Sequence, residues 1–169
     1  INSEWNRFHS KSKKNNFRKE IKLHSPTFGP EEITSFAHQM ITTNVTMGTK
    51  VSDFEKKFSK MFSFKHSITS NSGSSANLLA LSSFNFKKGS EVITPSLTFS
   101  TTVAPIYQLG LVPHFIGVEE NKFLADISQI KKCINKKTVA IMIPNLLGNI
   151  ADWKKIHSIA KKFNLKVIE

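Results

Sequence analysis

Small polar residues gather within residues 68–81, ITSNSGSSANLLAL, between a short apolar-alternating stretch and an apolar helical pattern. This order predicts a strand, a turn and a helix. Ser74 and Ser75 would lie at the helix N-terminus, where free amides and the helix dipole favour an anion, and Gly73 would let the backbone approach it. The turn is therefore predicted to bind a phosphate group. The pattern alone favours a simpler alternative, in which Ser74 or Ser75 only caps its own helix.

Two further side chains follow predicted strands. Phe99 comes after residues 91–95, and Asn145 comes after residues 139–143. Because ligands bind at the edge where parallel strands end, both residues would share a pocket with the serine turn. Taken alone, each has a simpler interpretation: Phe99 packs under its own helix, and Asn145 caps a turn.

Other catalytic signatures are missing from the sequence. It contains no GxGxxG, no lysine-bearing phosphate loop, no GxSxG and no HExxH. The six histidines are scattered without metal-ligand spacing, and Cys133 is the only cysteine, so no internal disulfide or cysteine cluster forms.

The elements that would position these residues alternate between strand and helix from residue 66 onward. This alternation predicts an α/β fold with a mainly parallel sheet and helices on both faces. Upstream, a helix from Pro30 and a second helix with a phenylalanine-rich stripe are predicted to bury their apolar sides. The predicted strands are 67–70, 91–95, 112–118, 139–143 and 166–169, and the helices between them are 75–84, 97–110, 126–134 and 152–163.

Charge divides the chain unevenly. Residues 1–22 hold seven basic and two acidic residues, which predicts a basic N-terminal arm ahead of a domain over residues 23–169. The net charge of +12 suggests nucleic-acid binding, but only Arg7 and Arg18 are arginine, the residue best shaped for base and phosphate contacts. The lysine pairs are predicted to form solvated faces spread around the molecule, so a nucleic-acid partner is disfavoured.

The ends of the chain and its hydropathy indicate whether it is part of a larger protein and where it is located in the cell. It opens on Ile1 and stops directly after the strand-like residues 165–168, which predicts a piece of a larger protein. No apolar run is long enough to span a bilayer, and no secretion signal is present. A cytoplasmic protein without a membrane partner is therefore expected.

Four co-linear segments resemble the DegT-type family of pyridoxal-phosphate enzymes that act on nucleotide-linked sugars. They are SNSGSSANLLAL, GSEVITPSLTFSTTVAPIYQLGLVP, KKTVAIMIPNLLGN and LKVIE, and the resemblance covers nearly everything after Pro26. It implies the N-terminal part of a fold-type I, aspartate-aminotransferase-like large domain, truncated at its C-terminal end. It also reverses the preference for the simpler interpretations given above.

The resemblance assigns roles to individual residues. Ser74 and Ser75, with Gly73 in the same turn, match the positions that bind the phosphate of pyridoxal or pyridoxamine 5'-phosphate. Phe99 matches the aromatic residue that stacks on the pyridine ring, and Asn145 matches a polar residue beside the cofactor.

The remaining site is expected mostly outside this chain. Met47 and Gly48 match a loop that lies near the active site or the substrate in family dimers. The resemblance places the aspartate that keeps the pyridine nitrogen protonated one position beyond Glu169, and the Schiff-base lysine or histidine further downstream. The chain alone is therefore predicted to hold no catalytic residue and to be inactive, with no metal site and any iron-sulfur cluster elsewhere in the parent protein.

The segments GSSANLLA and NLLGN are most similar to the branch of 3-dehydrases acting on 4-keto-6-deoxysugars. This implies a nucleotide-linked keto-deoxysugar substrate, C-3 dehydration, and a role in deoxysugar and lipopolysaccharide O-antigen biosynthesis. A glutamate-dependent sugar aminotransferase is the alternative, and a basic nucleic-acid-binding domain is the non-enzyme alternative. Family resemblance further implies a homodimer, and a reductase partner if the enzyme is of the iron-sulfur type.

Overall fold

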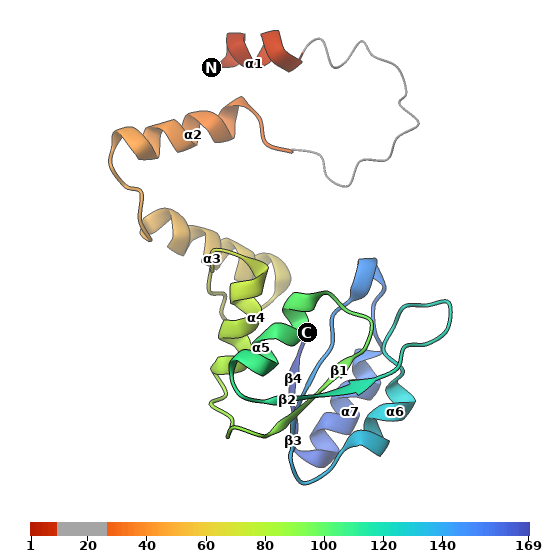
Figure 1. Ribbon diagram of the computed structural model, residues 1–169. Coiled ribbons are helices and arrows are strands. Elements are labelled where there is room, and N and C mark those ends of the chain that lie inside the picture. Colours follow the sequence, from red (N-terminus) through yellow and green to blue (C-terminus); the bar gives the residue numbers. More distant parts are fainter. Residues whose placement is uncertain (10–26) are drawn as a thin grey trace. The chain divides into compact units, whose positions relative to one another are not determined.

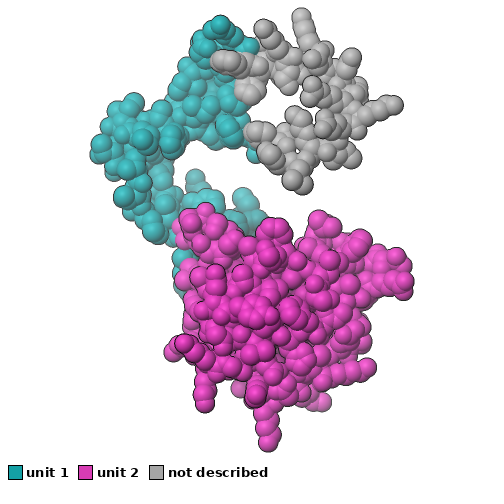
Figure 2. Space-filling model, in the orientation of Figure 1, with its two compact units in different colours: residues 1–68 teal, residues 69–169 magenta. Residues whose placement is uncertain are grey.

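The computed structural model describes residues 1–9 and 27–169. Most of the predicted basic arm therefore lies outside the described residues, and the arm stays a prediction. The chain divides into two compact units, residues 1–68 and residues 69–169 (Figure 2). The predicted boundary after residue 22 lies outside the described residues and stays a prediction. The division after Ile68 was not predicted from the sequence.

The first unit contains helices only in its described part: α1 (Asn2–His9), α2 (Pro30–Ile41) and α3 (Thr49–Phe62). Helix α2 begins at Pro30 as predicted, because proline suits the first helical position. The Glu32 carboxylate accepts a 2.6 Å hydrogen bond from the Gly29 amide and satisfies a donor ahead of this helix.

The apolar faces of α2 and α3 were predicted to be core, and this prediction is wrong for the structure described. Neither helix has a buried residue, and Phe36 on α2 is 67% exposed. On α3, Phe58 instead packs against the rings of Phe54 and Phe62, with centroids 5.8 and 4.6 Å away. Helical spacing identifies an apolar face, but the face is buried only where another element covers it.

The second unit is a four-stranded sheet in the order β2-β1-β3-β4, with every pairing parallel (Figure 1). The predicted α/β fold is confirmed.

None of the described helices is long and apolar enough to cross a bilayer. The elements are α4 (Gly73–Ser82), β1 (Glu91–Pro95), α5 (Ser100–Gln108), β2 (Val112–Ile116), α6 (Ile127–Cys133), β3 (Thr138–Met142), the 3-10 turn η2 (Leu146–Gly148), α7 (Trp153–Phe163) and β4 (Lys166–Ile168).

One predicted strand is missing. Residues 67–70 have no regular secondary structure, although their apolar alternation favours a strand. A strand forms only beside a partner, and the described sheet ends at β2 on one side and at β4 on the other.

Helices cover both faces of the sheet, as predicted. On one face Leu81 of α4 and Ile106 of α5 pack in a core cluster with Val92 of β1. On the other face Ile130 of α6 and Ile156 of α7 belong to a second cluster. Each fully buried aliphatic side chain contributes about 1.5–3 kcal/mol, so these clusters fix α4 and α5 on one face and α6 and α7 on the other.

Glu91 links three segments at the edge where the strands begin. Its Oε2 accepts a 2.6 Å hydrogen bond from Asn135 Nδ2, just before β3, and lies 3.1 Å from His114 Nδ1 on β2. The hydrogen bond from Asn135, followed by that from His114, holds the pKa of Glu91 below the usual 4.5.

We predict that Glu91→Gln reduces the loss of stability in acid. A lowered pKa in the folded state means that the carboxylate stabilises the fold above its unfolded-state pKa, near 4.5. This contribution is lost as the pH falls through the lower folded-state pKa. Urea unfolding from neutral pH to below that range measures the effect, with exposed Glu120→Gln as the matched control. Identical pH dependence in the wild type and Glu91→Gln would contradict the prediction.

A second prediction compares two buried threonines. Thr94 Oγ1 is buried without a hydrogen-bond partner among the described residues, whereas Thr138 Oγ1 accepts from the Asn135 amide at 3.0 Å. Replacing an unpaired buried hydroxyl by a methyl group removes a desolvation cost, so Thr94→Val should raise the free energy of unfolding by about 1 kcal/mol. Thr138→Val loses a hydrogen bond and should lower it by about 1 kcal/mol. Urea denaturation measures both, and destabilisation by Thr94→Val would be the contrary result.

Candidate cofactor site

Ser72, and neither Ser74 nor Ser75, caps helix α4. The Ser72 hydroxyl accepts a 3.2 Å hydrogen bond from the Ser75 amide and lies 3.2 Å from the Ser75 hydroxyl. The Ser70 hydroxyl donates to the Ser72 carbonyl at 2.9 Å and supports the turn. The simpler sequence interpretation, in which Ser74 or Ser75 is the cap, is therefore wrong. The sequence signal that could have identified this cap is the position of Ser72 directly before the first helical residue, where serine is a preferred cap.

Capping by Ser72 leaves donors free at the same helix end. The Ser75 amide is bonded to Ser72, and the Ala76 amide donates to the Ser72 carbonyl at 3.0 Å. The amides of Gly73 and Ser74 and the exposed Ser74 hydroxyl have no acceptor among the described residues. Gly73 itself is helical, and a Cβ built there meets nothing within 4 Å, so open space lies in front of the turn. Two amides and a hydroxyl without a described acceptor suit an oxyanion.

A direct bond joins α4 to the start of α5. Asn77 Nδ2 donates to the Thr101 carbonyl at 3.1 Å, and these helices lie side by side in Figure 1. Thr98 Oγ1 donates to Thr102 Oγ1 at 2.9 Å and steadies the segment that carries Phe99. Phe99 is 69% exposed at the residue before α5, so it does not pack beneath its helix. The structure therefore brings the serine turn and the exposed ring to neighbouring helix starts.

Asn145 lies at the same edge of the sheet, where β3 ends, and its amide is held on both sides. Its Oδ1 accepts from the Ala151 amide at 3.1 Å and from Trp153 Nε1 at 3.0 Å. Its Nδ2 donates to the carboxylate of Glu169, which follows β4. The sequence indicated a polar residue at Asn145 but did not indicate its hydrogen bond with Trp153. The two residues are eight positions apart, and no local sequence pattern predicts a bond between their side chains.

The helix starts on the two faces of the sheet differ in charge. Helix α4 is capped by a neutral hydroxyl and α5 has no side-chain cap, and neither has an acidic residue in its first turn. Asp126 caps α6 and Asp152 caps α7. Hydrogen bonds from Ser128 lower the pKa of Asp126, and bonds from Lys155 lower the pKa of Asp152, so both caps are carboxylates at neutral pH. An anion is therefore favoured on the α4 and α5 face.

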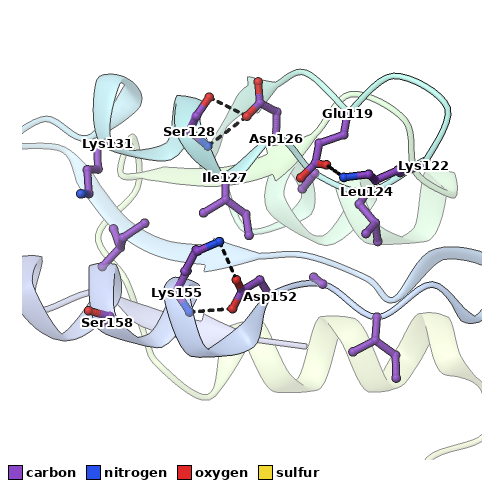
Figure 3. Close-up of a pocket in the computed structure, with 14 residues that line it drawn as sticks. Glu119, Lys122, Leu124, Asp126, Ile127, Ser128, Lys131, Asp152, Lys155 and Ser158 are labelled. Atoms are coloured by element: carbon purple, nitrogen blue, oxygen red, sulfur yellow. Dashed lines mark hydrogen bonds and ion pairs between the residues drawn. The ribbon is translucent and has the colours of Figure 1, made fainter.

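A hollow of about 840 Å³ lies between α6 and α7 and contains none of the predicted cofactor residues (Figure 3). Two of its three lysines form ion pairs with carboxylates of the same lining: Lys122 with Glu119 at 2.6 Å, and Lys155 with Asp152 at 2.9 Å. It borders the site only through Ala151, which donates to Asn145.

Met47 and Gly48 belong to the first unit, so their relation to the serine turn stays a prediction. Met47 is exposed, and Gly48 precedes α3 with an extended backbone.

Comparison with known proteins identifies the fold family. The profile of the DegT/DnrJ/EryC1/StrS aminotransferase family matches residues 26–169. The chain belongs to this family. A GDP-4-keto-6-deoxy-D-mannose 3-dehydratase of Yersinia pseudotuberculosis is 34% identical over 153 residues, covering 87% of this chain and 39% of the relative. The lipopolysaccharide biosynthesis protein RfbH of Salmonella typhimurium is 37% identical over 149 residues, covering 83% and 34%.

A solved structure of this DegT-type family gives the same fold. It is an E. coli GDP-4-keto-6-deoxy-D-mannose-3-dehydratase with bound hydrated pyridoxal phosphate, with a TM-score of 0.82 and 31% identity over 88% of this chain and 40% of that one. The present chain thus spans about a third to two fifths of the length of these relatives. A phosphate-bearing cofactor fits the donors at the start of α4, because two amides and a hydroxyl are free there.

We predict different stability effects for Ser72 and Ser74, which flank Gly73 in this DegT-type chain. Ser72→Ala removes the cap of α4 and should lower the free energy of unfolding by about 1 kcal/mol. Ser74→Ala removes a hydroxyl without a described partner and should leave stability unchanged. Urea unfolding without cofactor tests the pair, and equal losses in both variants would contradict this assignment of the cap.

Proposed function

We propose that this chain forms the cofactor-binding N-terminal part of a pyridoxal- or pyridoxamine-phosphate enzyme that acts on a nucleotide-activated 4-keto-6-deoxysugar. The observation that carries the proposal is the start of α4, where free Gly73 and Ser74 amides lie beside no acidic residue. The hydrogen bond from Asn77 to the Thr101 carbonyl joins α4 to α5, and the exposed ring of Phe99 lies at the start of α5. A phosphate donor set and an exposed ring are the two contacts that such a cofactor requires from this half of a site.

Each residue has a proposed role. Gly73, Ser74 and Ser75 hold the phosphate, with the Ser75 hydroxyl oriented by Ser72 at 3.2 Å. Phe99 stacks on the pyridine ring, and Asn145 lies beside the cofactor with its orientation set by two donors to Oδ1. When bound, the cofactor supplies an electron sink for the sugar substrate. The residues of this chain bind and orient it.

The proposed reaction is C-3 dehydration in deoxysugar and lipopolysaccharide O-antigen biosynthesis. The 34% identity to a protein named as a 3-dehydratase and the 37% identity to RfbH support this choice. The alternative is glutamate-dependent sugar transamination, favoured by the aminotransferase name of the family. The Schiff-base lysine or histidine, an iron-sulfur cluster and its reductase partner, if present, would lie outside this chain.

The assembly and place of action are also proposals. We propose a cytoplasmic homodimer in which Met47 and Gly48 lie near the active site or the substrate of a neighbouring subunit. The exposed side chain of Met47 is compatible with such a contact.

Ser74→Ala is predicted to weaken the binding of pyridoxal phosphate about tenfold, equivalent to ~1.4 kcal/mol, through loss of one hydrogen bond to a charged phosphate. Ser82→Ala is the control, because Ser82 ends α4 and its hydroxyl donates to the Leu79 carbonyl. Titration of the complete apoprotein followed by cofactor absorbance gives both dissociation constants. Equal affinity in Ser74→Ala and the wild type would remove the serine turn from the proposed site.

The reaction itself is tested with GDP-4-keto-6-deoxy-D-mannose and the complete protein. Loss of the sugar's 3-hydroxyl, detected by mass spectrometry, is the result expected for a dehydrase. Transfer of an amino group from glutamate to the keto sugar would identify the aminotransferase alternative. Absence of both reactions, with cofactor binding intact, would reject this substrate but retain the cofactor site.

A further inference from the structure

The lysines of the second unit are concentrated at one edge of the sheet. The strands are all parallel, so they begin at the same edge, and the helices between them end there. Nine of the twelve lysines within residues 69–169 lie in the helix ends, turns and strand starts of this edge, and all nine are exposed. They are Lys87, Lys88, Lys131, Lys132, Lys136, Lys137, Lys161, Lys162 and Lys166, and are called the lysine face below.

The sequence predicted lysine pairs spread around the molecule, and four of the six pairs instead lie together at this edge. Lys154 and Lys155 lie at the start of α7, at the opposite edge, and Lys56 and Lys57 lie in the first unit. Sequence spacing shows that the pairs lie on helices and turns, but only the parallel topology shows that these positions meet. The last turns of α6 and α7 each carry a pair, where positive charge also compensates the negative helix end. The electrostatic potential of the lysine face is therefore the sum of several pairs rather than of one.

Acidic residues do not neutralise the lysine face. Glu91 is the only acidic residue at this edge, and its side chain is 18% exposed and directed to Asn135 and His114. The other five acidic residues of the unit lie toward the edge where strands end: Glu119, Glu120, Asp126, Asp152 and Glu169. The unit thus carries a strong excess of positive charge at one end.

The side chains at the lysine face are suited to a particular anionic surface. The basic residues within 69–169 are all lysine, which is a hydrated point charge without the planar fork that arginine offers to bases and phosphates. Apolar side chains at the same edge are also exposed: Phe84 is 36%, Val112 47% and Phe163 40% exposed. Lys162 Nζ lies 5.8 Å from the centre of the Phe163 ring. Lysines interspersed with apolar tips are typical of surfaces that rest on lipid headgroups.

We propose that the lysine face docks the protein on an anionic phospholipid bilayer. The lysines attract the charged headgroups, and Phe84 and Phe163 enter the headgroup layer. The edge with the serine turn then faces away from the membrane, because it is the opposite end of the same strands. This role departs from the expectation of no membrane partner, and it does not depend on the proposed enzymatic function.

The test uses the complete protein and two kinds of vesicle, phosphatidylcholine alone and phosphatidylcholine mixed with phosphatidylglycerol. We expect co-sedimentation with the anionic vesicles only, weakening as salt is raised. A variant with Lys136→Gln, Lys137→Gln, Lys161→Gln and Lys162→Gln should lose at least about a hundredfold in affinity, since each lysine near a membrane contributes roughly fivefold. The matched control removes the same charge from the first unit with Lys56→Gln, Lys57→Gln, Lys60→Gln and Lys65→Gln.

The control variant should retain most of the binding, and circular dichroism should show both variants folded. Equal loss in the two variants would mean that binding follows net charge and would overturn the proposal. So would unchanged vesicle binding when the lysine face is neutralised. Binding to duplex DNA that is lost in the lysine-face variant, without any binding to anionic vesicles, would assign the surface to nucleic acid and also reject the proposal.

Discussion

β1 pairs in parallel with β2 on one side and with β3 on the other, and the rest of the second unit depends on this pairing. It places every strand start at one edge and every strand end at the other. Each connecting helix must return the chain to the starting edge, so the helix N-termini collect where the strands end. The serine turn, Phe99 and Asn145 share one edge for this reason, and the lysine face occupies the opposite one.

The amide of Asn145 shows how that edge is made rigid. Two donors, the Ala151 amide and the Trp153 indole, fix its oxygen, so the group cannot flip without losing both bonds. Its nitrogen is then directed to Glu169 beyond β4. One side chain thereby ties the ends of two neighbouring strands to the start of α7. A ligand site at this edge would be built on fixed backbone rather than on a loop free to move.

The sequence predicted the parts of the fold that local pattern determines. Short apolar segments identified β1 to β4, and the helix predicted over residues 152–163 corresponds to α7. It failed where the outcome depends on a distant partner: residues 67–70 lack a neighbouring strand, and the faces of α2 and α3 lack a covering element in the described chain. The role of Trp153 was not predicted because it comes from a tertiary hydrogen bond to Asn145. The role of Ser72 was missed for a local reason, because three serines compete for the cap position within four residues. The family resemblance supplied cofactor roles that no periodicity contains.

The choice of capping residue distinguishes the start of α4 from the starts of α6 and α7. Every helix start has unsatisfied amides and a partial positive charge. At α6 and α7 an aspartate supplies both a hydrogen bond and a negative charge, so an incoming anion would be repelled. At α4 the Ser72 hydroxyl satisfies one amide and adds no charge, which leaves the helix dipole uncompensated and two amides free. The kind of capping residue therefore makes the α4 face of the sheet more favourable for an anion than the α6 and α7 face.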